Sequence, residues 1–255
     1  MKFITSFFIF GFFCYCSITA LLYIFQRNLL YFPTPKFDHP FEEIQFQNQG
    51  ETISVISLNK NNDKALIYFG GNGEAVVASA DELKSAFPDF TIYLLNYRAF
   101  GGSTGKPTEK EIYADALALY KIIKQKHTNI SVIGRSLGSG VATYLAANRN
   151  IHKTVLVTPY DSILNIAKKQ FRFFPVKLLL KDKFDSLSRV NSISSKVLVI
   201  AAEHDEVIPM ENTENLVNKF PNEQIRFKLI YGSGHNNLSI SKEYYSAIFN
   251  FLGKG

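Results

Sequence analysis

Residues 130–140 read ISVIGRSLGSG, and this short stretch carries the main signal for the fold. A β-branched, apolar run ends at Gly134, and a helix-forming run, LGSGVATYLAAN, follows at once. Residues 134–138 fit G-x-S-x-G, the pattern of a sharp strand-to-helix turn that lifts a serine above the edge of a sheet. Such a turn is too tight for side chains at its flanking positions, which accounts for Gly134 and Gly138.

This turn makes Ser136 the candidate nucleophile. The helix that follows directs its N-terminus at the serine, so the backbone amide of Leu137 is a candidate donor to an oxyanion. The alternative is a glycine-rich turn that holds an inert serine. Because the pattern stands between a strand signal and a helix signal, as the motif requires, the nucleophile is the favoured interpretation.

Strand and helix signals alternate along the rest of the chain. Near-continuous apolar runs, typical of strands buried on both faces, occur at 54–58, 65–69, 91–96, 130–134, 154–158, 196–202 and 225–231. Helical patterns lie between them, at roughly 74–86, 109–126, 137–148, 162–180, 211–220 and 240–252. This alternation predicts an α/β fold with a mostly parallel central sheet covered by helices. In such a sheet, reactive groups gather at the carboxyl ends of the strands.

A serine nucleophile needs a base, and two of the five histidines follow strands. His235 lies in GSGHNNL after the last strand, where glycines let the loop carry the ring over the serine, so it is the predicted base. His204 follows the preceding strand but adjoins the candidate acids. His127 and His152 are expected at the opposite end of the sheet, and His39 comes before the sheet begins.

The base in turn needs an acid to orient it. The chain order Ser…Asp/Glu…His places that acid after an intermediate strand. The run at 196–202 is followed by Glu203, His204, Asp205 and Glu206, so position alone leaves three carboxylates as candidates.

A second oxyanion donor is expected from the loop after 65–69, which reads GGNGE at 70–74. Its glycines let the backbone approach a tetrahedral intermediate, and the amide of Asn72 is the predicted donor. A dinucleotide site is the rival interpretation. That motif, G-x-G-x-x-G, would need a third glycine where Val76 stands.

The stretch AFGGSTGKPT at 99–108 raises the question of a phosphate-binding loop. A Walker loop would need glycine where Phe100 stands and Ser or Thr where Pro107 stands, so the sequence predicts no nucleotide site here. We expect instead a structural loop beside the nucleophile turn, braced by Arg98. Thr108 is the expected N-cap of the helix that follows.

The segment 3–26 contains no charged residue and is long enough to cross a bilayer as a helix. We expect an uncleaved membrane anchor over 1–28. The rival is a cleaved signal peptide, but Ala20 lacks a small residue two positions before it. The basic residues at the two ends mark the orientation weakly, and we expect a cytoplasmic N-terminus with the catalytic domain on the extracytoplasmic side.

After the anchor, residues 29–40 form a connector and 41–255 one domain, which suits a chain of 255 residues with 46% hydrophobic content. Both cysteines, Cys14 and Cys16, lie in the anchor, so the domain has no thiolate nucleophile and no Cys-ligated metal site. The net charge of +6 fits an anionic membrane surface or nucleic acid. No Lys/Arg block, RNA-binding signature or zinc-finger spacing supports nucleic acid.

Eight motifs in order resemble those of the Bem-type membrane-anchored α/β-hydrolases. They are LLYFPTP, YFGGNGE, NYRAFGGSTGKPTE, GRSLGSGVA, TPYDSI, FDSLSRV, EHDEVIP and GSGHNNL. This group is similar to protein depalmitoylases and to lysophospholipid and monoacylglycerol lipases. The resemblance implies the α/β-hydrolase fold and a serine hydrolase without metal or cofactor. Through the EHDEVIP loop it implies Asp205 as the acid, with Glu203 and Glu206 as runners-up.

Two motifs depart from the family pattern. Residues 70–72 read Gly-Gly-Asn where the family often has His-Gly-Asn, and residues 96–99 read Asn-Tyr-Arg-Ala where it often has Asp-Tyr-Arg-Gly. The first departure would change how the oxyanion loop is braced. Neither removes a member of the triad Ser136, Asp205 and His235.

Residues 160–190 lie where this fold often covers its pocket, and QFRFFPVKLLLKDKF at 170–184 mixes apolar with basic side chains. We expect a cap that sits at a lipid surface and admits acyl chains; the alternative is that these apolar residues pack on the sheet with their lysines in water. The sequence therefore predicts hydrolysis of carboxylic esters or thioesters of acyl or lipid substrates. A serine aminopeptidase and a catalytically silent membrane-anchored scaffold are the alternatives.

Overall fold

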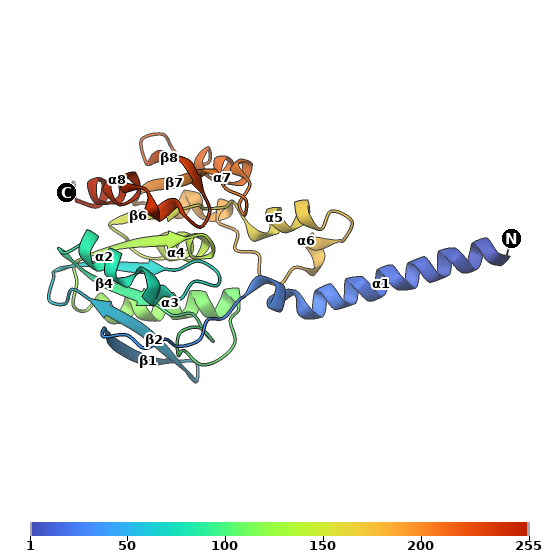
Figure 1. Ribbon diagram of the computed structural model, residues 1–255, viewed down its shortest axis with the longest axis horizontal. Helices are drawn as coiled ribbons and strands as arrows, with labels where there is room; N and C mark the ends of the chain where they lie inside the picture. Colours follow the sequence, from blue (N-terminus) through green and yellow to red (C-terminus); the bar gives the residue numbers. More distant parts are fainter. Residues whose placement is uncertain (1, 254–255) are drawn as a thin grey trace.

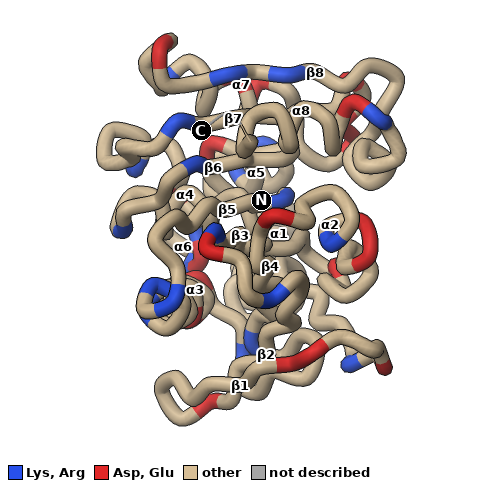
Figure 2. The backbone as a smooth tube through the Cα atoms, turned by 90° about the vertical axis from the view of Figure 1, so that its left-hand side faces the viewer, with Lys and Arg blue, Asp and Glu red and all other residues tan. Residues whose placement is uncertain are grey.

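A computed structural model describes residues 2–253, and its centre is one eight-stranded sheet. The strand order is β1-β2-β4-β3-β5-β6-β7-β8, which Figure 2 shows running from one edge of the molecule to the other. The strands are β1 (Glu42–Asn48), β2 (Glu51–Leu58), β3 (Lys64–Phe69), β4 (Phe90–Leu95), β5 (Asn129–Arg135), β6 (Lys153–Val157), β7 (Lys196–His204) and β8 (Ile225–Gly234).

The sheet is mostly parallel. Every pairing from β4 to β8 is parallel, and only β1 and β2 at one edge run antiparallel to their neighbours. The predicted fold class is therefore confirmed, and all seven predicted strands are present. The apolar-run criterion missed β1, because this edge strand alternates between exposed and half-buried residues and is rich in Gln and Glu.

Helices cover both faces of the sheet (Figures 1 and 2). The α-helices of the domain are α2 (Ala80–Ala86), α3 (Glu109–Ile123), α4 (Leu137–Asn148), α5 (Ile163–Gln170), α6 (Val176–Leu179), α7 (Met210–Val217) and α8 (Lys242–Gly253). Side chains of α3, α4 and α7 form one apolar core with one face, and those of α2 and α8 form a second core with the other. This layering leaves the carboxyl ends of the parallel strands free for loops.

The N-terminal helix α1 (Lys2–Leu30) projects from the domain, as Figure 1 shows. Its residues Phe3–Leu30 are long and apolar enough to cross a membrane, and the side chains of the apolar stretch are not buried in the domain. By length and composition alone, a signal sequence would pass the same test. Its last turns lie beside α5 and α6.

The segment expected as one helix over 162–180 forms two, α5 and α6. Pro175 separates them: proline has no N–H for a helical hydrogen bond, and it disfavours helical backbone at the residue before it.

Asp161 holds the start of α5 against α7. It is buried and accepts hydrogen bonds from the Ser162 amide at 2.6 Å and the Asn212 side chain at 2.8 Å.

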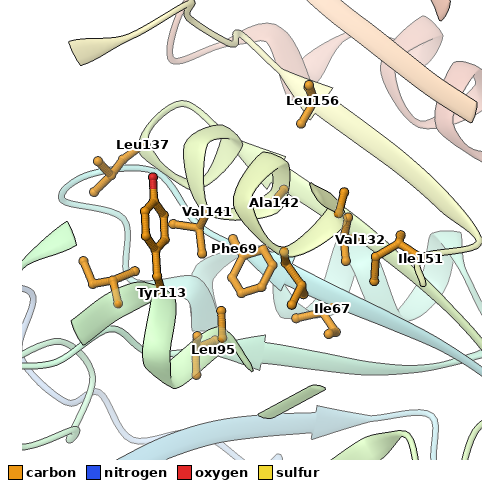
Figure 3. Packing of buried hydrophobic residues seen from close by; sticks show 14 of the residues in the cluster. Ile67, Phe69, Leu95, Tyr113, Val132, Leu137, Val141, Ala142, Ile151 and Leu156 are labelled. Carbon is orange, nitrogen blue, oxygen red and sulfur yellow. The ribbon is translucent and has the colours of Figure 1, made fainter. Parts of the chain in front are cut away.

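The core below the candidate nucleophile is tightly packed. Leu137 and Val141 of α4 lie over Phe69 at the end of β3, with Tyr113 of α3 beside them (Figure 3). These side chains are almost fully buried. The start of α4, and with it the turn at Ser136, is thus fixed on the sheet by apolar contacts.

The loop at 96–108 is structural, as its residues predict. Arg98 forms a buried, two-pronged ion pair with Asp115 of α3, at 2.9 and 3.0 Å. Tyr97 donates a hydrogen bond to the Gly70 carbonyl at 2.8 Å, which ties this loop to the glycine loop after β3. The Thr108 hydroxyl accepts from the Glu111 amide at 3.2 Å, which confirms the predicted N-cap.

The Arg98–Asp115 pair yields a stability prediction. Arg98→Met leaves the Asp115 carboxylate buried without its cation, and breaking a buried pair in this way costs about 3–5 kcal/mol. We expect urea unfolding of the full chain in detergent, followed by circular dichroism, to show that loss. Lys60→Ala is the control, because Lys60 pairs with Glu42 where both side chains are exposed (51% and 42%), and it should cost less than about 1 kcal/mol. Equal, small losses in both variants would contradict the prediction.

Candidate active site

Ser136 occupies a strained turn between β5 and α4. Its backbone has φ 50° and ψ −116°, a conformation that residues other than glycine rarely adopt. A Cβ on Gly134 would lie 2.3 Å from the Gly138 carbonyl oxygen, and one on Gly138 would lie 2.1 Å from the Phe69 carbonyl oxygen. Both glycines are therefore required by the packing of the turn, as the sequence pattern predicts.

The structure brings Ser136, His235 and Asp205 together from three strand ends. The His235 Nε2 atom lies 2.9 Å from the Ser136 Oγ atom, and its Nδ1 atom lies 2.9 Å from each carboxylate oxygen of Asp205. Ser136 is only 8% exposed, and the side chains of His235 and Asp205 are each 6% exposed. Water therefore competes little for these hydrogen bonds.

The Asp205 carboxylate is itself held in place. Its Oδ1 atom accepts hydrogen bonds from the amides of Val207 and Ile208, at 2.9 and 2.7 Å. The loop after β7 thus closes around the carboxylate and aims it at the His235 ring.

The two runner-up acids serve the backbone of the histidine loop instead. Glu203 accepts from the Gly232 amide at 2.8 Å, and Glu206 accepts from the His235 amide at 3.1 Å. Hydrogen bonds from its own amide and from the His235 amide lower the pKa of Glu206. This support is therefore present above the ordinary pKa of a glutamate and is lost as the pH falls through the lowered value.

The glycine loop after β3 lies against the serine. A Cβ on Gly71 would be 3.6 Å from the Ser136 Cβ atom. Among the described residues, the backbone amides of Asn72 and Leu137 make no hydrogen bond, whereas the Gly71 amide is bound to Glu74 at 2.7 Å. The amides of both predicted oxyanion donors thus have no hydrogen-bond partner among the described residues.

The Asn72 side chain does something that the sequence did not suggest. Its Nδ2 atom donates to the Leu30 carbonyl at 2.7 Å, and its Oδ1 atom accepts from the Phe32 amide at 3.0 Å. The oxyanion loop is therefore tied to the end of α1. The motif His-Gly-Asn has a histidine side chain at the position of Gly70. In this chain, the Asn72 side chain ties the loop to the end of α1 instead.

An ion pair links the loops around the serine, and sequence reasoning missed it. The Glu74 Oε2 atom lies 2.9 Å from an Arg135 nitrogen, and Glu74 also accepts from the hydroxyls of Tyr68 and Ser79. Arg135 reaches the His235 carbonyl at 3.3 Å. Burial lowers the pKa of Arg135, but the Glu74 carboxylate and the neighbouring Tyr68 and Tyr244 together outweigh it, so that the pKa is raised. The sequence offered one signal for this pair: GGNGE at 70–74 contains the charged residue Glu74, and GRSLG at 134–138 contains Arg135.

The other histidines lie elsewhere. His204 is exposed and contacts Glu203, and His39 pairs with Glu43. His127 contacts the Tyr93 hydroxyl at 2.8 Å. His127 precedes β5 and His152 precedes β6, so both lie at the opposite end of the sheet from Ser136. Within residues 2–253, no three His, Cys, Asp or Glu side chains are grouped as the ligands of a metal would be.

Comparison with known proteins agrees with this architecture. Residues 64–188 match the family model for the alpha/beta hydrolase fold. This chain has the α/β-hydrolase fold. Among solved structures, the Pyrococcus furiosus esterase Pf2001 superimposes with a TM-score of 0.71 over 88% of this chain and 97% of the esterase, at 19% identity. At that identity the α/β-hydrolase likeness concerns the fold alone.

Curated relatives match parts of this chain. An uncharacterized protein of Mycobacterium tuberculosis is 32% identical over 151 residues, 58% of this chain and 53% of that protein. An uncharacterized protein of Acanthamoeba polyphaga mimivirus is 28% identical over 215 residues, 75% of this chain and 73% of that protein. Human alpha/beta hydrolase domain-containing protein 17C is 28% identical over 165 residues, 63% of this chain. The match spans about half the length of the first and third of these relatives.

The Glu74–Arg135 pair generates a test of how the site is positioned. Glu74→Gln keeps the size of the side chain but removes the charge that holds Arg135, so the glycine loop and the histidine loop lose their common tie. Because a displacement of about 1 Å in a reacting group costs about a hundredfold in rate, we expect fluorophosphonate to label the variant tenfold to a hundredfold more slowly.

Glu82→Gln, on the exposed face of α2, is the matched control and should label at the wild-type rate. Thermal melts followed by circular dichroism check that both variants are folded. A folded Glu74→Gln variant that labels within twofold of the wild-type rate would show that the ion pair does not position the site.

Proposed function

We propose that this protein is a serine hydrolase that cleaves carboxylic esters or thioesters of acyl or lipid substrates. The observation that carries the proposal is the continuous hydrogen-bonded line from Ser136 Oγ through the His235 ring to Asp205. A serine, a base and an orienting acid in that order are what acyl transfer requires. The α/β-hydrolase fold, the esterase likeness and the Bem-type motif order support the same class.

The reaction follows from the positions of the groups. The Asp205 carboxylate accepts a hydrogen bond from the Nδ1–H group of His235, which leaves Nε2 free to take the proton of the Ser136 hydroxyl as its oxygen attacks the carbonyl carbon. The negative charge then rests on the former carbonyl oxygen, within reach of the amides of Leu137 and Asn72. As this intermediate collapses, the bond from the acyl carbon to the leaving oxygen or sulfur breaks, and protonated His235 gives its proton to the leaving alcohol or thiol. The acyl group stays on Ser136 as an acyl-enzyme.

The second half of the reaction repeats the first with water. The His235 Nε2 atom takes a proton from a water molecule, whose oxygen attacks the acyl carbon and forms a second oxyanion. Collapse of that intermediate breaks the bond to the Ser136 oxygen, which takes the proton back from His235, and releases the carboxylic acid. These steps use side chains and backbone amides of this chain, and no cofactor is proposed.

We also propose that α1 is an uncleaved anchor, with a cytoplasmic N-terminus and the catalytic domain on the extracytoplasmic side. Contacts made by α1 before Ala20 support retention of the helix, because cleavage at Ala20 would remove them: the Tyr15 hydroxyl donates to the Phe173 carbonyl at 2.9 Å, and the Tyr15 ring stacks on the Phe174 ring. The Arg27–Asp182 ion pair at 2.9 Å joins the end of the same helix to the cap. Phe173 and Leu178 of the cap, 73% and 83% exposed, are suited to a lipid surface.

The nucleophile is tested by labelling and turnover in parallel. Ser136→Ala should abolish fluorophosphonate labelling and lower kcat on p-nitrophenyl butyrate by at least about 10⁴-fold, because it removes the attacking oxygen. Ser188→Ala, an exposed serine outside the site, should leave both unchanged. Labelling that survives in Ser136→Ala would refute the assignment, and a wild-type protein that neither labels nor turns over would favour the silent scaffold.

The bond type is settled by comparing substrates at equal concentration. Acyl p-nitrophenyl esters and acyl thioesters should give a kcat/KM at least tenfold higher than aminoacyl p-nitroanilides. The opposite order would establish the serine aminopeptidase in place of the esterase.

A further inference from the structure

A cavity of about 190 Å³ lies between α1 and the cap helices α5 and α6. Its lining is mainly aliphatic and aromatic and includes Leu22 and Leu30 of α1, Ile166 of α5, and Phe174, Val176 and Leu179. On α1, the half-buried positions Thr19, Leu22, Gln26 and Leu30 recur every three to four residues and so form one stripe that faces the cap.

The two walls are fastened together at both ends of this cavity. At the outer end, the Tyr15 ring stacks on the Phe174 ring at 5.4 Å and its hydroxyl donates to the Phe173 carbonyl at 2.9 Å. At the inner end, Gln26 donates to the Leu179 carbonyl at 3.2 Å and accepts from the Lys181 amide at 2.7 Å. Figure 1 shows α5 and α6 alongside the C-terminal half of α1.

The lining has four polar side chains, those of Thr19, Tyr23, Gln26 and Gln170, and two of them are already occupied. The Thr19 hydroxyl donates to the Tyr15 carbonyl at 2.7 Å, and the Gln26 amide is used by the cap as described. The cavity therefore offers few groups that would hold water or a charged ligand, and apolar surface is what it offers to an occupant.

The position of the cavity along α1 indicates the source of that occupant. A hydrocarbon core of about 30 Å takes about 20 helical residues, so a core that begins at Phe3 ends near Leu22. Tyr15 then lies about 10 Å inside it, at 1.5 Å per residue, and Phe173 and Phe174 lie at the same depth. Interfacial elements sink about 5–10 Å into a bilayer. The outer end of the cavity is therefore open to lipid tails rather than to water.

The inner end is joined to the oxyanion loop by one hydrogen bond. Leu30 lines the cavity, and its carbonyl accepts the Asn72 hydrogen bond from the oxyanion loop. Ile163, which also lines it, begins α5 shortly after β6, at the carboxyl edge of the sheet. From Thr19 to Leu30 the cavity extends about 16 Å along the helix, about the depth of one leaflet.

We propose that α1 is one wall of an acyl-binding cavity, and that the acyl chain of a lipid enters it sideways from the surrounding leaflet. The membrane helix is then part of the substrate site and not only a tether. This inference rests on the proposed function, because it places the acyl chain of the ester whose carbonyl Ser136 attacks.

The first test fills the cavity from the α1 side in the full-length protein. Leu22→Trp adds bulk to the cavity, and Ile24→Trp adds the same bulk to the exposed opposite face of α1. On p-nitrophenyl palmitate in phosphatidylcholine vesicles, we expect Leu22→Trp to lower kcat/KM at least tenfold. On p-nitrophenyl butyrate it should stay within twofold of wild type, and Ile24→Trp should stay within twofold on both esters.

The outcomes separate the two proposals. If Leu22→Trp hydrolyses palmitate and butyrate esters as the wild type does, the cavity proposal is wrong while the esterase stands. If the wild type hydrolyses neither ester, the proposed function is wrong, and the cavity is then judged by a binding measurement that needs no turnover.

That measurement uses Ser136→Ala in vesicles that contain phosphatidylcholine with a diazirine near the end of one acyl chain. Irradiation should attach the lipid to Ile166 and Ala167 on the cavity side of α5, and Leu22→Trp in the same background should reduce that yield at least tenfold while Ile24→Trp should not. The photolipid supplied in separate vesicles should give no attachment at these residues. Labelling of α1 alone, with none on α5, would overturn the proposal.

Discussion

The turn at Ser136 is the constraint on which the rest of the site depends. The chain must reverse direction between β5 and α4 with the backbone of Ser136 at φ 50°, and the helix must lie so close to β3 that position 138 has no space for a Cβ. Strain of this kind persists only where the surroundings determine it. Here they do so through the buried contacts of Leu137 and Val141 and through the Ser136 amide, which donates to the Val157 carbonyl at 2.9 Å.

Once that turn is fixed, the remaining loops are positioned by polar groups rather than by the core. Glu74 accepts from a backbone amide, two hydroxyls and a guanidinium, so most of the acceptor capacity of this nearly buried carboxylate is used. A buried ion pair gains little net stability, because desolvation offsets the attraction. Its value at this place is geometric: one pair ties the oxyanion loop, the nucleophile turn and the histidine loop to one another.

Local patterns were enough to predict most of the fold and the core of the candidate site. The apolar runs that became β3 to β7 are largely buried on both faces, so composition alone reveals them, whereas β8 is a partly exposed edge strand. Ser136, Asp205 and His235 each follow one of the predicted strands. What escaped prediction depends on partners distant in the chain. β1 pairs with β2 through a two-residue turn at Gln49 and Gly50, yet its own residues are half polar. Glu74 and Arg135 are 61 residues apart, and neither has a local pattern that names the other.

For the same reason, the sequence did not predict which face of the N-terminal helix contacts the domain. A charge-free segment of this length predicts a membrane span and nothing about a site, because hydropathy does not say which face meets protein. The stripe of half-buried residues on α1 acquires meaning only beside the cap, and the Asn72 side chain acquires meaning only beside Leu30. Because one asparagine carries both a candidate oxyanion amide and the bond to α1, a shift of α1 would be transmitted directly to the oxyanion loop. A single side chain thereby joins the end of the N-terminal helix to the candidate site.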